Sequence, residues 1–459
     1  MRLCNAKRSL FCVKHIDDRK IMKTCDSNTV LFIFAKFFMN IQKVMSFKVG
    51  LFCLCLVSAL SFSQVKPKIN WSLFSQVWLR YSELNEGTLV NGEAASDLID
   101  VSIRRLRIPV SSQISPKVFA YALFGGNNYN IATAQDVDFP LKVLDLYVEY
   151  AFSKVLEMGI GKSGWQGLNR WNVRSAKSLM ALDAPLFSLN TVEKTDDLAR
   201  NLGVWFKGKV GKVDYRVSVV RPNVVKSIPN GDVDFANNKP NLRSGGYLKY
   251  QFFEHESNKG AYQTGTYINK KKVLNIGAGF QYQKDALSDG DVALVTTNLF
   301  DIRHWAVDSF LSLPLFNGEG ITAYLGFYHY DFGEEYIRNV GANGVAFSGG
   351  SDFNGAGISF PLIGSGDSVF TQFGYAFSEV NMGSEVVVFQ PNIAVQYSDW
   401  NLLNQSMVVY DCTVNAYLDG HDHKISLGYQ SRPIFGSNSL IEVDRKGMWV
   451  LQYQFGFGN

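Results

Sequence analysis

The sequence predicts an all-β chain that closes into a transmembrane antiparallel β-barrel of about 16 strands. Three observations predict this fold: apolar and polar residues alternate along most of the chain, the alternating segments are long, and short connections alternate with long ones. Alternation with a period of two indicates a strand with one apolar and one polar face. No helical periodicity of comparable strength competes with it.

The composition agrees with this fold class. The 459 residues include 40 Gly, 34 Phe and 21 Tyr but only 12 Pro, and 19% of them are charged. These values exclude a disordered chain, a collagen and a coiled coil. Residues 64–459 contain no run of the roughly 18 apolar residues that a membrane helix needs. Any membrane role would therefore come through strands or an anchor.

The N-terminal region reads as a leader. From Met45 a short basic start, an apolar run at 49–60 and small residues up to Ser63 are typical of a secretory signal peptide, with cleavage after Ser63. We interpret residues 1–44 as translation from an upstream start codon; the alternative is a cytoplasmic extension with 49–60 as a buried or anchoring segment. The expected division is 1–63 for the leader, with the signal at 45–63, and 64–459 for the barrel.

Removal of residues 1–63 changes the charge and the cysteine count. It leaves 35 basic and 38 acidic residues, a formal charge of −3. The basic character of the full chain thus comes from the leader, and no nucleic-acid partner is expected. Cys412 alone remains of six cysteines, so no internal disulfide and no cysteine metal site are expected.

The alternating segments favour a barrel over a soluble sandwich. The clearest of them are longer than the 5 or 6 residues typical of soluble sheets and approach the roughly 9 to 11 of membrane strands. An apolar face opposite a polar face, repeated from segment to segment, indicates an apolar exterior around a wet interior. Closure also pairs every backbone N–H and C=O group, as hydrocarbon requires. These segments lie at 69–81, 143–150, 212–220, 273–282 and 408–418.

The connections give the strand count. Seventeen candidate strands appear, but an odd number would break the rhythm of short and long connections, so the weak candidate at 355–360 is assigned to a loop, which leaves 16. The connection at 254–271 falls at the end of the barrel where the connections are otherwise short, and the sequence does not explain its length. The short connections are expected near 111–116, 151–154, 207–212, 314–319, 379–386 and 419–424, and the long ones near 82–99, 125–140, 163–197, 222–245, 283–302, 331–368, 398–407 and 431–446.

Several short phrases resemble the phosphate-selective porin O/P family of Bacteroidota-type envelopes. The resemblance implies a 16-stranded outer-membrane porin, commonly a homotrimer, with an inward-folded loop and basic residues along an anion path. Membrane lipid and small anionic or neutral solutes would be its partners. The phrases are at 102–110, at 159–162 followed by 182–187, at 200–204, at 417–425 and at 451–455.

The charges expected on the lumenal face are mixed. A phosphate filter would show a clear excess of Arg and Lys, because basic rings select anions electrostatically. Mixed charge fits a general pore better. By parity the lumenal residues include Asp145, Glu149, Glu157 and Asp214 as well as Arg105, Arg107, Lys212 and Arg216.

Two groups of basic residues are the candidates for the solute path. On the strand at 102–110, Arg105 and Arg107 face the lumen if their apolar neighbours face lipid, whereas Arg104 lies at an interface or marks a bulge. A wall of salt bridges is the alternative. The loop at 163–197 is the expected constriction, and an ordinary exposed loop is the alternative. The full candidate set is Arg105, Arg107, Arg170, Arg174, Lys177 and Arg216.

The predicted function is a passive outer-membrane pore for small hydrophilic solutes, with anions such as phosphate as candidates. No enzymatic reaction and no cofactor are expected. One alternative is a plugged barrel that serves as a structural subunit of an outer-membrane complex. Another is a secreted soluble β protein.

Overall fold

The structure is a computed structural model that describes residues 67–130, 139, 141–165, 167–192, 200–221, 233–236, 241–289, 298–343, 348–349 and 353–459. Residues 66–459 form one compact unit. The predicted leader at 1–63 lies outside the described residues. In the part of the chain that is described, no helix is long and apolar enough to cross a membrane.

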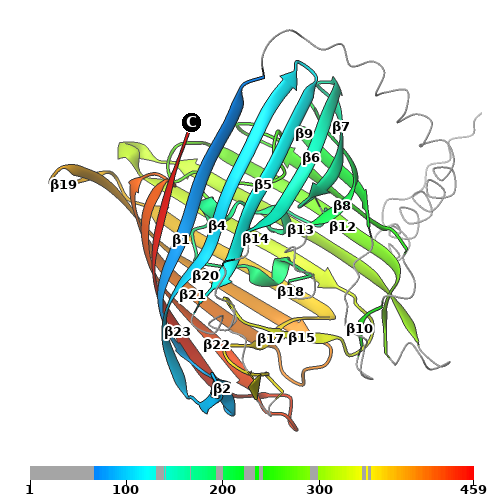
Figure 1. The fold of residues 1–459 in the computed structure, drawn as a ribbon, viewed down its shortest axis with the longest axis vertical. Helices are drawn as coiled ribbons and strands as arrows, with labels where there is room; N and C mark the ends of the chain where they lie inside the picture. The colour runs from blue at the N-terminus through cyan, green and yellow to red at the C-terminus, as the bar shows by residue number, and fades with distance from the viewer. Residues whose placement is uncertain are drawn as a thin grey trace, which may run out of the picture. The chain divides into compact units, whose positions relative to one another are not determined.

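Sixteen long antiparallel strands close into a barrel (Figure 1). The first, β1 (Ile69–Glu83), pairs with β4 (Asp97–Ser115) on one side and with the last, β23 (Glu442–Gly458), on the other. The sheet therefore has no free edge, and the predicted fold class and strand count are confirmed. The other wall strands are β5 (Val118–Tyr129), β6 (Lys142–Ser153), β7 (Leu156–Ser163), β8 (Asn201–Val210), β9 (Val213–Val220), β11 (Arg243–Gln251), β12 (Val273–Ser288), β13 (Leu299–Pro314), β14 (Gly320–Tyr330), β18 (Gly366–Ala376), β20 (Glu385–Trp400), β21 (Met407–Asp419) and β22 (His423–Phe435).

Short elements supplement the wall. Two brief strands extend it: β10 pairs with the end of β12, and β19 forms a hairpin with the start of β20. The remaining strands form small sheets in the connections. The bounds are β2 (Thr88–Val90), β3 (Glu93–Ala94), β10 (Asp234–Phe235), β15 (Ile337–Val340), β16 (Ser348–Gly349), β17 (Phe360–Gly364) and β19 (Val380–Met382), and the 3₁₀ turns are η3 (Trp171–Val173), η4 (Ala176–Ser178), η5 (Leu186–Ser188) and η6 (Phe316–Gly318).

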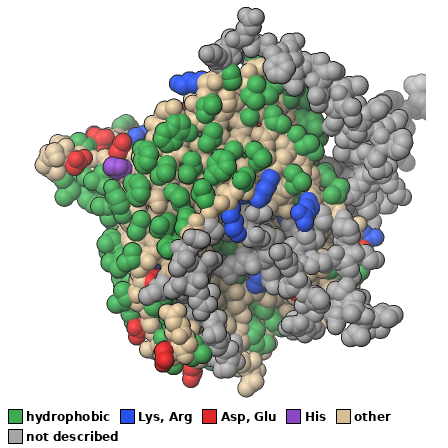
Figure 2. Space-filling view, viewed as in Figure 1, with side chains coloured by type: hydrophobic (Ala, Val, Ile, Leu, Met, Phe, Trp, Pro, Cys, Tyr) green, Lys and Arg blue, Asp and Glu red, His purple; other side chains and the backbone are tan. Residues whose placement is uncertain are grey.

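The two faces of the wall differ as the alternation predicts. On β1 the side chains of Leu79 and Tyr81 are exposed, whereas those of Arg80 and Ser82 point into the barrel and are buried. Apolar side chains cover the outer wall around β1 and β4 (Figure 2). An apolar outer face is the one that a barrel presents to lipid.

The connections follow the predicted rhythm. Short ones join β4 to β5, β6 to β7 and β8 to β9, and long ones follow at the opposite end. The weak candidate at 355–360 is not a wall strand: β17 begins only at Phe360 and pairs with β15 within the long connection from β14 to β18. Its assignment to a loop is confirmed.

The lumen is less open than the expected wet interior. A buried hydrophobic cluster lies inside it, where Trp171 and Phe187 from the β7–β8 connection pack against Tyr324, Tyr328 and Phe370 of the wall. The expectation assumed that lumenal side chains meet water. Aromatic residues on the inner face of β14 and β18 instead meet apolar side chains of an inward-folded connection, and this burial stabilises both.

Candidate functional site: a basic cavity in the lumen

The β7–β8 connection folds into the barrel. We call its described residues 164–192 the inward loop; residue 166 is not described. Polar side chains of the wall hold its backbone: Lys424 Nζ donates to the Leu179 carbonyl at 2.9 Å, and Asn415 donates to the Met180 carbonyl at 2.9 Å. Because each bond satisfies a buried carbonyl, the polar inner face of the wall serves as an anchor for the loop.

The β11–β12 connection also enters the lumen. We call its residues 252–272 the inward turn, and it is the connection whose length had no explanation in the sequence. The backbone N–H of Gln263 donates to the backbone carbonyl of Val173 at 2.7 Å. The backbone N–H of Ser175 donates to the backbone carbonyl of Gln263 at 2.8 Å. The inward loop is thus held by a second segment that enters from the end opposite to its own. The length of the turn is what allows it to reach the loop.

Glu256 is the charged centre of this junction. Its buried carboxylate accepts two hydrogen bonds from Arg170, at 2.7 and 2.6 Å, and one from Lys249 at 3.0 Å. Burial acts to raise the pKa of Glu256, but the charges of Arg170 and Lys249 outweigh it and hold that pKa well below its usual range. Arg170 also lies over the Phe310 ring at 3.6 Å. The structure therefore places Arg170 in a buried ion pair.

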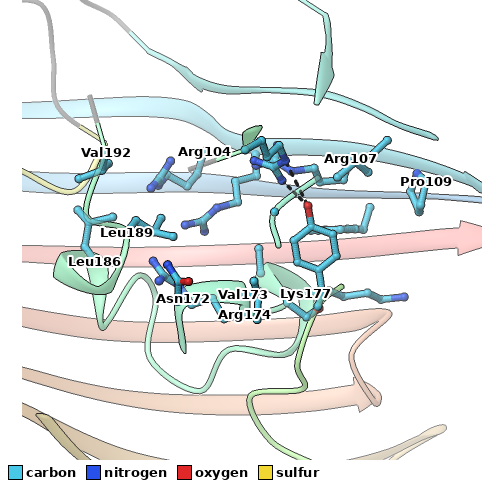
Figure 3. Close-up of a pocket in the computed structure, with 18 of the residues that line it drawn as sticks. Arg104, Arg107, Pro109, Asn172, Val173, Arg174, Lys177, Leu186, Leu189 and Val192 are labelled. Carbon is cyan, nitrogen blue, oxygen red and sulfur yellow. Dashed lines mark hydrogen bonds between the residues drawn. The ribbon is translucent and has the colours of Figure 1, made fainter. Parts of the chain in front are cut away.

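A cavity of about 240 Å³ lies between β4 and the inward loop (Figure 3). It brings together four of the six candidate residues, two from the wall and two from the loop. Arg104 and Arg200, which are outside the candidate set, complete a lining that, among the residues the structure describes, has six cations and no carboxylate. The cationic lining residues are Arg104, Arg105, Arg107, Arg174, Lys177 and Arg200.

A β-bulge turns Arg104 inward. In the register of β1 with β4, Gln76 pairs with Arg105 and Val77 pairs with Ile103, so Arg104 has no partner in the ladder. Of the two alternatives for this residue, the register shows the bulge. An extra residue changes the facing of its neighbours, which lets two adjacent arginines reach the same side of the strand.

One carboxylate serves both of these arginines. Asp183 of the inward loop accepts hydrogen bonds from Arg104 Nε at 2.8 Å and Arg104 Nη2 at 3.0 Å, and a further close one from Arg105 Nη2. Burial opposes ionisation of Asp183, but the charges of Arg104 and Arg105 prevail and lower its pKa to about 2. The ion pair fastens the loop to the wall and leaves one positive charge in excess.

Two further arginines have neutral partners. Arg107 donates to the Gly126 carbonyl at 2.8 Å and to the Asn127 side chain at 2.6 Å. Arg174 donates through Nη1 to Ser188 Oγ at 2.7 Å and to the Trp171 carbonyl at 3.2 Å. Within the described part of the chain, neither makes an ion pair. Burial and the charge of Arg105 lower the pKa of Arg174 to about 9, which shows how poorly its charge is compensated.

The lumenal carboxylates expected from parity are paired with cations, one of which, Arg200, also lines the cavity. Glu149 pairs with Lys207 at 2.7 Å, and Asp145 pairs with Arg200 at 3.2 Å. Asp214 lies 3.6 Å from Arg216, whose guanidinium stacks 3.6 Å over the ring of Trp165. Arg216 is thus buried beneath the inward loop and lies outside the lining of this cavity. The mixed charge of the sequence separates into paired walls and a cationic cavity.

Lys177 occupies the edge of the cavity. It forms an ion pair with Asp422 in the β21–β22 turn, and both side chains are partly exposed. Solvent screening reduces the strength of such a pair. We therefore expect Lys177 to contribute less to the field in the cavity than the buried arginines do.

The pKa of Asp183 predicts how the loop responds to acid. Because this pKa falls from 3.8 to about 2 on folding, ionised Asp183 stabilises the docked loop above pH 3.8, and that stabilisation, about 2 kcal/mol, is lost as the pH falls toward 2. Pepsin cleavage near Phe187 should therefore accelerate between pH 4 and pH 2.

The control for this prediction is Asp183→Asn, which cannot ionise. Its loop should be cleaved at a similar rate at both pH values, after correction for the pH dependence of pepsin on an unfolded substrate. Heat-modifiable gel migration checks that the barrel is closed. Equal acceleration in the wild type and the variant would show that Asp183 does not hold the loop.

No protein-family model and no curated protein matches this chain. Solved structures do align with it. The outer membrane channel DcaP of Acinetobacter baumannii is 12% identical, with a TM-score of 0.48, over 86% of this chain and 99% of that one. An anion-selective porin from Comamonas acidovorans is 9% identical, with a TM-score of 0.46, over 85% and 100%. Salmonella typhi OmpF is 10% identical, with a TM-score of 0.46, over 84% and 97%. Likenesses this distant carry no inference about ligand or selectivity.

Proposed function

We propose that the protein is an outer-membrane porin that passes small hydrophilic solutes and favours anions over cations. The observation that carries this proposal is the charge of the lumenal cavity. Six cations line it, and three carboxylates among the described residues pair with them: Asp183, Asp145 and Asp422. Cationic linings lower the free energy of anions in a pore and raise that of cations.

The membrane setting follows from the wall. Its outer face is apolar and its sheet is closed, as a chain surrounded by lipid requires. The expected signal peptide would deliver the chain across the inner membrane. The proposal includes no reaction and no cofactor. From the family resemblance it takes phosphate as one candidate solute and a homotrimer as the assembly, to be tested by cross-linking in detergent.

Planar-bilayer recordings test the selectivity. Under a potassium chloride gradient, Arg107→Gln and Arg174→Gln should each lower the ratio of anion to cation permeability several-fold, because each removes a positive charge that makes no ion pair with a described carboxylate. The same recordings in phosphate report whether this anion passes.

The matched control is Arg303→Gln. Arg303 lies on the outer face of β13, is half exposed and pairs with Asp301, so the variant loses the same charge outside the lumen. Its selectivity should equal that of the wild type. Unchanged selectivity in both cavity variants would remove Arg107 and Arg174 from the path.

A plugged barrel is the second candidate function. The hydrophobic cluster between the inward loop and the wall favours it, because that cluster fills part of the lumen. A protein that gives no current and co-purifies with a partner in fixed proportion would be a structural subunit.

A further inference from the structure

The cavity has a second chemical character besides its charge. Apolar side chains line it together with the arginines: Pro109 from β4, Leu123 from β5, and Leu186, Leu189 and Val192 from the inward loop. Figure 3 shows Leu186, Leu189 and Val192 grouped together, across the view from Arg107 and Pro109. The site thus offers cationic and apolar surface to one occupant.

A small inorganic anion matches only half of this surface. Phosphate carries oxygen atoms on every side, and an oxygen held against leucine and valine would lose a hydrogen bond to water without gaining another. An organic anion has one charged end and one apolar end. Its apolar end would pack against Val192 and remove the partly exposed side chain of Leu189 from water, which is favourable.

Arg174 presents the free edge that such a charged end needs. Its two hydrogen bonds to described residues both come from Nη1, which leaves the Nε and Nη2 edge without a partner among these residues. That edge is the one that binds a carboxylate with two parallel hydrogen bonds. The bond from Arg174 to Ser188 also fixes the guanidinium beside Leu189, the next residue in the chain.

Two arginines of the same lining already bind a carboxylate of the chain itself, which lies beside the cavity. Asp183 is bound by Arg104 through the Nε and Nη2 edge, with Arg105 as a further donor. The guanidinium groups of this cavity therefore bind a carboxylate in the geometry required. Arg174 presents the equivalent Nε and Nη2 edge, and no carboxylate of the described residues binds to it.

We propose that this cavity is a binding site for small organic carboxylates, with the carboxylate on the Nε and Nη2 edge of Arg174 and the apolar body against Leu189 and Val192. The inference rests on the proposed function, since it places the site on the solute path. It extends the proposed function by naming small organic carboxylates as the class of solute that binds in the cavity.

Benzoate is the probe, with inorganic phosphate and neutral benzamide as comparisons. In planar bilayers benzoate should halve the chloride current at a concentration at least tenfold below those that phosphate and benzamide require. Leu189→Asn should raise the half-blocking concentration of benzoate at least fivefold, whereas Leu189→Met, which keeps an apolar side chain, should stay within twofold of the wild type. Gel migration of the unheated protein checks that each variant folds.

The outcomes separate this inference from the proposed function. A chloride-selective current that benzoate blocks no better than phosphate overturns the carboxylate site and leaves the porin standing. If no current flows, calorimetric titration of the detergent-solubilised protein with benzoate decides. Binding that Leu189→Asn weakens supports the site without the pore, and the absence of binding overturns it.

Discussion

Replacing Glu256 with glutamine is expected to release the inward loop from the inward turn. Glu256 is the carboxylate that both Arg170 and Lys249 contact, and all three side chains are almost fully buried. Glutamine keeps the size of the side chain but removes its charge. Two buried cations would then face each other without a counter-ion.

The expected effect is large because the pair is buried. Removing one partner of a buried ion pair costs about 3–5 kcal/mol, since the remaining charge stays desolvated. The loop and the turn can escape this penalty by leaving the lumen while the barrel stays closed. Trypsin should then cleave Glu256→Gln at Arg174 or Lys177 at least tenfold faster than the wild type, with unchanged gel migration of the unheated barrel.

Glu254→Gln is the matched control. Glu254 lies in the same turn but is exposed, and it accepts a hydrogen bond from the Lys272 amide. The Glu254→Gln variant loses the same charge as Glu256→Gln but breaks no buried ion pair. Its rate of cleavage by trypsin should therefore match that of the wild type. Equal protection of Glu256→Gln would mean that the Glu256 cluster does not hold the loop.

Replacing Gly428 with leucine is expected to increase anion selectivity. Gly428 lies on the inner face of β22, and a Cβ atom there would lie 2.5 Å from Leu182 Cδ1. Such crowding forces side chains or backbone to shift and costs about 1–3 kcal/mol. Leu182 precedes Asp183, so a displaced Leu182 withdraws the carboxylate from Arg104 and Arg105.

The measurement is the ratio of anion to cation permeability in planar bilayers. Two guanidinium groups without a counter-ion should raise this ratio at least threefold. Ala416→Leu, on the outer face of the neighbouring strand β21, introduces the same side chain toward lipid and should leave the ratio unchanged. A ratio in Gly428→Leu that equals the wild type would show that Asp183 does not control the charge in the cavity.

The wall of the barrel could be predicted from the sequence because side-chain facing alternates strictly along a strand. Asp411 and Thr413 point inward and Cys412 points outward, as parity requires. The rhythm of connections also gave the count of 16, because a closed antiparallel barrel with both termini at one end needs an even number. Local pattern and global closure thus agree.

The contents of the lumen could not be predicted in the same way. Parity indicates that Tyr324 and Tyr328 face inward, but it does not show that Trp171 and Phe187 meet them there. The long connection at 254–271 was the one visible sign of a second inward segment. The loop at 163–197 was expected to form the constriction, but its contact with this connection joins residues about 90 apart in sequence and could not be derived from the sequence alone.

The candidate site was predicted only in part, because parity places residues on one strand but does not reveal contacts between distant segments. Arg105 and Arg107 follow from parity on one strand, whereas the place of Arg104 depends on a bulge that the sequence leaves open. Asp183 and Glu256 were absent from the candidate set because their partners are 79 and 86 residues away in sequence. Arg170 was assigned to the path as a cation in a long loop, but its carboxylate partner holds it in the lumenal junction.

The most direct test of the account is the reversal potential of the wild-type protein in a planar bilayer under a tenfold gradient of potassium chloride. A water-filled path past a cationic cavity predicts a steady current that reverses at a potential displaced toward the equilibrium potential of chloride. A reversal potential displaced toward that of potassium, or no current from a correctly closed barrel, would contradict it.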